Sequence, residues 1–62
     1  MDNTERHYIN MAFERYLKLR EREGHLQARA NAMVYSDIRL IFWRNVSRET
    51  RERIDAYEKI NN

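Results

Sequence analysis

The chain lacks the residues with which small proteins cross-link or sharply turn the backbone. Its 62 residues include no Cys, no Pro and a single Gly, Gly24. Without Cys there can be no disulfide and no thiolate metal site, and the two His residues are not spaced as metal ligands. Scarcity of Pro and Gly disfavours strand-and-turn folds and favours long helices. These absences predict an all-α domain that holds neither a disulfide nor a cofactor.

Long apolar runs and catalytic motifs are also missing. The longest wholly apolar run, residues 40–43, is four residues long, whereas a membrane-spanning helix needs about 20. The sequence contains no HExxH motif, no Gly-rich phosphate loop and no nucleophile–base arrangement. We therefore expect a protein that is not an enzyme and has no membrane partner, with a cytoplasmic location as the default.

What the chain does have is a hydrophobic fraction of 42% with seven aromatic residues. A domain of this size buries only about 60% of the surface of its unfolded chain, so its stability is marginal without support. Because disulfides and metals are excluded, oligomerisation or docking is the remaining means of stabilisation. We predict one domain over residues 1–62 that forms a homodimer or docks on a larger protein.

Apolar residues recur at helical spacing in three segments, which predicts helices over about 3–23, 25–44 and 48–60. Gly24 is placed to end the first helix, and Ser47 is a good N-cap for the third. The predicted architecture is a hairpin of the first two helices with a shorter third helix folded against it. A strand over 34–43 is the alternative, because β-branched and aromatic residues are dense there.

The predicted second helix is more apolar than its place in a small domain requires. From Ala28 to Val46 the apolar side chains leave only a narrow polar strip, as in a helix covered on several sides. Asp37 is surrounded by apolar neighbours on this helix, and Trp43 lies in the polar strip one turn after Arg39. The predicted partner-binding residues are Arg29, Ser36, Asp37, Arg39, Trp43 and Arg44.

Both unusual residues also have ordinary structural explanations. The alternatives for Asp37 are an internal bridge to an Arg or Tyr of another helix, a pair across a subunit interface, exposure to solvent, or a role as a functional acid. Trp43 either tucks under the third helix or forms an exposed hot spot with Arg39, since Trp and Arg dominate binding energies at interfaces. The sequence leaves these alternatives open.

The basic residues are mostly Arg, which accounts for ten of the twelve. Acids and bases are equal in number in residues 1–23 and in residues 48–62, so the net charge of +2 comes from the segment between them. Arg is enriched at protein interfaces and also suits phosphate. Acidic residues interleave with the bases of the third predicted helix, so no strong basic face is expected there.

These observations predict a non-catalytic protein–protein interaction module, a small regulator or inhibitor that binds a larger protein or associates with itself. The alternative is a helix-turn-helix-like nucleic-acid-binding regulator. Its contacts would come from the third predicted helix, through Arg48, Thr50, Arg51 and Arg53.

Overall fold

Three helices make up the part of the chain that can be described. A computed structural model describes residues 3–32 and 39–61, and all of these are helical except Gly24 and Arg39. The helices are α1 (Asn3–Glu23), α2 (His25–Ala32) and α3 (Leu40–Asn61). The described residues contain no strand, so the all-α class is confirmed, and residues 40–43 of the alternative strand are helical.

Helix α1 has the bounds that the sequence predicted, and it ends for the predicted reason. Gly24 adopts a φ of 88°, a left-handed conformation that L side chains rarely adopt. Its amide donates to the carbonyl of Arg20 over 3.1 Å, and its own carbonyl accepts from the amide of Ala28 over 3.0 Å. A single glycine therefore closes α1 and begins α2.

The predicted boundary between the second and third helices is wrong. Arg39 is not helical, α3 begins at Leu40, and it continues without interruption through the proposed cap at Ser47. Ser47 is buried inside α3, where its hydroxyl donates to the carbonyl of Arg44 over 3.2 Å. A Ser hydroxyl can serve as an N-cap or bond back to its own helix, and here it does the second. The third helix is thus the longest of the three and α2 the shortest.

Helix α2 buries a different side from the one that the sequence predicted. Ala28 and Ala32 are fully buried, whereas Leu26, an apolar residue of the predicted second helix, is exposed. Two Ala residues four apart lie on one side of the helix and give it a smooth surface there. Packing at close range therefore decides the orientation of α2, more than the apolar content of its side chains.

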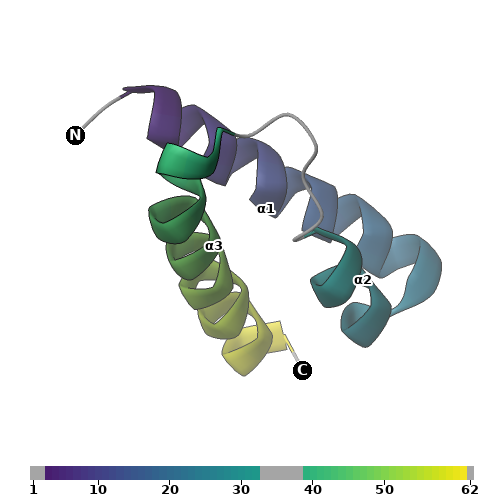
Figure 1. Cartoon of the computed structure of the whole chain (residues 1–62). Helices are drawn as coiled ribbons and strands as arrows, with labels where there is room; N and C mark the ends of the chain where they lie inside the picture. The colour runs from purple at the N-terminus through teal and green to yellow at the C-terminus, as the bar shows by residue number, and fades with distance from the viewer. Residues whose placement is uncertain (1–2, 33–38, 62) are drawn as a thin grey trace.

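Helix α1 packs against both other helices. Figure 1 shows α2 folding back from the end of α1, while α3 runs from the start of α1 toward α2. Near their N-terminal ends α1 and α3 are joined by the contact of Glu5 with Asn45, and near their C-terminal ends by the contact of Arg20 with Asn61. These two helices therefore run in the same general direction.

The core lies where the three helices meet. Tyr16 of α1, Ala28 and Ala32 of α2, and Ile54 of α3 form a buried cluster. Half-buried side chains pack around it, and the ring of Tyr57 meets that of Tyr16 edge-on at 6.0 Å between centroids. Among the described helices, none is long and apolar enough to cross a membrane.

Candidate partner-binding surface

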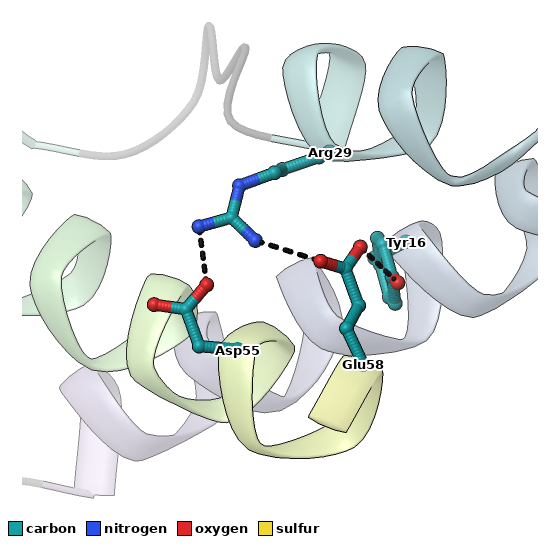
Figure 2. A network of polar contacts seen from close by, with 4 residues as sticks. All are labelled: Tyr16, Arg29, Asp55 and Glu58. Atoms are coloured by element: carbon teal, nitrogen blue, oxygen red, sulfur yellow. Dashed lines mark hydrogen bonds and ion pairs between the residues drawn. The ribbon is translucent and has the colours of Figure 1, made fainter. Parts of the chain in front are cut away.

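A network of polar side chains joins all three helices on one side of the core (Figure 2). The Tyr16 hydroxyl donates to Glu58 Oε2 over 2.8 Å. The guanidinium of Arg29 donates to Glu58 Oε1 over 3.1 Å and forms a second ion pair with Asp55. Tyr16 belongs to α1, Arg29 to α2, and both carboxylates to α3. The network therefore ties the short helix α2 to both long ones.

Burial and charge reinforce this network. Burial of the Tyr16 ring, together with the hydrogen bond to Glu58, raises the pKa of its hydroxyl to about 12. The hydrogen bond to Asp55 raises the pKa of Arg29, which outweighs the opposing effect of burial. Tyr16 stays neutral and Arg29 stays charged at ordinary pH, so each keeps the form that its partners require.

Arg29, one of the predicted partner-binding residues, makes its described contacts within the chain. Its side chain is 34% exposed and is occupied by two carboxylates of the same chain. The sequence did not indicate this pairing, because Arg29 lies 26 and 29 residues before Asp55 and Glu58. Of the other predicted partner-binding residues, Ser36 and Asp37 lie outside the described residues.

Trp43 belongs to α3, which changes its surroundings. It was placed in the polar strip of a helix that also contained Arg29, and that helix does not extend so far. In α3, Trp43 precedes the buried Val46, Ser47 and Thr50 at helical spacing, and it is half-buried. Arg39, just before α3, and Arg44, one turn into it, are both exposed.

The sequence did not predict the exposure of Leu40 and Ile41. They stand in the first turn of α3 with 89% and 79% of their surface exposed. The sequence assigned both to the buried side of a second helix. Because that helix ends earlier, the start of α3 presents them to solvent between two exposed arginines, Arg39 and Arg44.

The residues of the nucleic-acid alternative separate into different environments. Thr50 is fully buried, so its side chain is not part of the surface. Arg53 donates to Asn10 Oδ1 over 2.7 Å and stacks over the ring of Phe13, which holds it against α1. Arg48 and Arg51 are exposed, and Arg48 also donates to Asn45 of the preceding turn.

The continuity of α3 creates a surface that was not predicted. Ile41, Arg44, Arg48 and Arg51 follow at steps of three or four residues and therefore lie along one side of the helix. With the adjacent Leu40 they form an exposed flank of α3, beside the buried Val46, Thr50 and Ile54. We call the set of Leu40, Ile41, Arg44, Arg48 and Arg51 the apolar–arginine face. A helix that began only after Ser47, as the sequence predicted, would separate Arg44 from Arg48 and Arg51.

The acidic residues of α3 compete less with these arginines than the sequence implied. Asp55 and Glu58 both pair with Arg29, and Glu49 is half-buried. Only Glu52, of the four acids in this helix, is exposed without an ion pair to another described residue. Residues 39–53 contain five Arg and two Glu, a net charge of +3 against +2 for the entire chain.

The remaining surface gives little sign of a chemical site. In the described part of the chain there is no cluster of three or more His, Asp or Glu side chains that could hold a metal ion. The hollows on α3 and α1 are open to solvent and lined largely by charged side chains, such as Arg48 and Glu52 on α3. Neither hollow has the enclosed, mostly apolar form typical of small-molecule sites.

Comparison of the chain with known protein families, curated proteins and solved structures finds no match.

Proposed function

We propose that this protein is a non-catalytic binding module that acts as a small regulator or inhibitor by docking the start of α3 on another protein. The observation that carries the proposal is the exposure of Leu40 and Ile41, adjacent residues in the first turn of α3. Single exposed apolar residues are common on protein surfaces, but adjacent ones rimmed by polar groups are typical of interaction sites.

The neighbours of these two residues strengthen the proposal. Arg39 and Arg44 flank them and are exposed. The half-buried Trp43 follows in the same turn of α3. Aromatic and Arg side chains are enriched at interfaces and at the residues that dominate binding energy. A partner that covered Leu40 and Ile41 would also reach these side chains.

A photo-crosslinking amino acid at position 41 tests this proposal. Ile60 supplies the matched control, because it is an isoleucine of the same helix and is 84% exposed. We expect a discrete protein adduct from position 41, absent from position 60, and its loss when Leu40 is changed to Ser. Self-association would appear as an adduct of twice the chain mass. Equal adducts from both positions, or none from position 41, would contradict the proposal.

Nucleic-acid binding is a second candidate, and one observation favours it. Arg44, Arg48 and Arg51 align on one side of α3, and aligned arginines attract phosphates. On this alternative, binding to a DNA duplex or single strand falls steeply with salt, and Arg48→Ala weakens it for all base sequences alike. Absence of binding at low salt would remove the candidate.

A further inference from the structure

The apolar–arginine face consists of an apolar part followed along the helix by a positively charged part. Leu40 and Ile41 occupy its first turn, and the three arginines occupy the next two turns. Arg44 and Arg51 have no ion pair within residues 3–32 and 39–61, although acids are frequent in this sequence. The line of arginines therefore carries an excess of positive charge, and apolar side chains lie at its N-terminal end.

The polar network explains why the imbalance persists. Asp55 continues the line of Ile41, Arg44, Arg48 and Arg51 by one further turn, where it could pair with Arg51. Instead its carboxylate pairs with Arg29 of α2, and Glu58 does the same (Figure 2). The tertiary fold thus engages Asp55 and Glu58 with α2, and Glu52 is the acid of α3 that remains exposed beside the arginines.

We infer that the occupant of this face is an acidic amphipathic helix of a partner protein, with apolar side chains in one turn and carboxylates in the next two. This inference rests on the proposed function and names the chemistry of the partner. Guanidinium groups bind carboxylates in paired hydrogen bonds. Arg44, Arg48 and Arg51 span about 10 Å of helix, a spacing that carboxylates at steps of four and three residues reproduce.

The apolar end of the face favours a protein over a nucleic acid as the occupant. Leu40 and Ile41 offer no donor to a phosphate and bury apolar surface only against an apolar partner. Glu52 lies at the edge of the arginine line and would repel a phosphate backbone. A helical partner can place its carboxylates toward the arginines and avoid Glu52, whereas a continuous phosphate backbone has less freedom to do so.

The test uses a synthetic helix-forming peptide with two Leu in one turn and Glu at positions four and three residues apart over the next two turns. Its binding to the full chain is followed by amide chemical shifts and fluorescence anisotropy. We expect shifts centred on the apolar–arginine face and at least tenfold weaker binding to the triple variant Arg44→Glu, Arg48→Glu, Arg51→Glu. Arg22→Glu, which makes one third of that charge change at an exposed position of α1, should alter the affinity less than twofold.

Three results would overturn the inference. The first is shifts on another surface, and the second is equal binding of a peptide in which Lys replaces every Glu. The third is tighter binding of a DNA oligonucleotide than of the acidic peptide at the same salt concentration, which would favour the nucleic-acid candidate. If the peptide fails while crosslinks from position 41 persist, the acidic chemistry is wrong and the proposed function stands. Failure of both experiments removes the proposed function as well.

Discussion

The two halves of α3 both contain isoleucine and charged residues, but these residues have different surroundings. In the C-terminal half, Ile54 is fully buried and the acids pair with Arg29. In the N-terminal half, Ile41 is exposed and the arginines face solvent. The N-terminal half also buries Val46 and Thr50, but its first turn is exposed, whereas the C-terminal half supplies both ion pairs to α2. Tertiary contacts, more than composition, therefore decide which charged residues of α3 are paired.

The largest expected effect comes from shortening isoleucine in the two halves. Ile54→Ala should lower the free energy of unfolding by about 2–5 kcal/mol, because it removes buried methyl groups and leaves a cavity in the core cluster. Ile41→Ala should change it by less than about 0.5 kcal/mol, since the side chain is exposed. Urea unfolding measures both. Similar losses from the two variants would mean that the halves do not differ as described.

A smaller effect is expected when the network loses its cation. Arg29→Met should cost about 2 kcal/mol, because Glu58, with a side chain only 18% exposed, loses its ion-pair partner. The pair with Asp55 contributes less, since that carboxylate is 60% exposed and screened by solvent. Arg44→Met, at an exposed position of the N-terminal half, is the matched control and should be nearly neutral in thermal unfolding.

Removing the Tyr16 hydroxyl should cost about 1–2 kcal/mol near neutral pH, because Tyr16→Phe deletes a hydrogen bond to a charged group. The folded protein raises the pKa of Tyr16 to about 12, above the value near 10 of an unfolded chain. The unfolded state therefore ionises first, and this contribution is complete below pH 10 and lost as the pH rises toward 12.

Urea unfolding of wild type and Tyr16→Phe from pH 8 to pH 12 measures this dependence. The stability difference between the two proteins should shrink across the upper two pH units, because other titrating groups are common to both. A difference that stays constant to pH 12 would contradict the assignment of Tyr16 as a neutral donor to Glu58.

The smallest expected effect is a gain in stability. The hydroxyl of Thr50 is fully buried and has no hydrogen-bond partner among the described residues. Thr50→Val keeps the shape of the side chain and removes this unsatisfied group, so it should stabilise the protein by about 1 kcal/mol. Ser47→Ala is the contrasting control, because the Ser47 hydroxyl is bonded within the helix. Thermal unfolding that shows Thr50→Val to be the less stable protein would contradict this prediction.

Much of α1 could be predicted from the sequence because its signals are local. The apolar stripe that includes Ile9, Ala12 and Tyr16 is buried, and Gly24 supplies the left-handed cap that only glycine adopts without strain. The all-α class followed from the scarcity of Pro and Gly in the same way. These features depend on residues a few positions apart.

The error at Ser47 had a signal that could have prevented it. The stripe of Thr50, Ile54 and Tyr57 extends upstream at helical spacing through Ser47, Val46 and Trp43, with no Gly or Pro to interrupt it. A single helix satisfies this pattern better than two. The candidate surface was missed for the same reason, since the line from Ile41 to Arg51 exists only when the helix is continuous.

By itself, the sequence determined the helical class, the extent of α1 and the glycine turn, because each rests on local backbone preferences and short-range periodicity. Only the tertiary structure decided which side of α2 is buried and which carboxylates Arg29 binds. Close packing selects Ala28 and Ala32 over Leu26, and the pairing joins residues more than 25 positions apart. Those long-range contacts also pair Asp55 and Glu58, the two acids that follow the apolar–arginine face in α3, with Arg29.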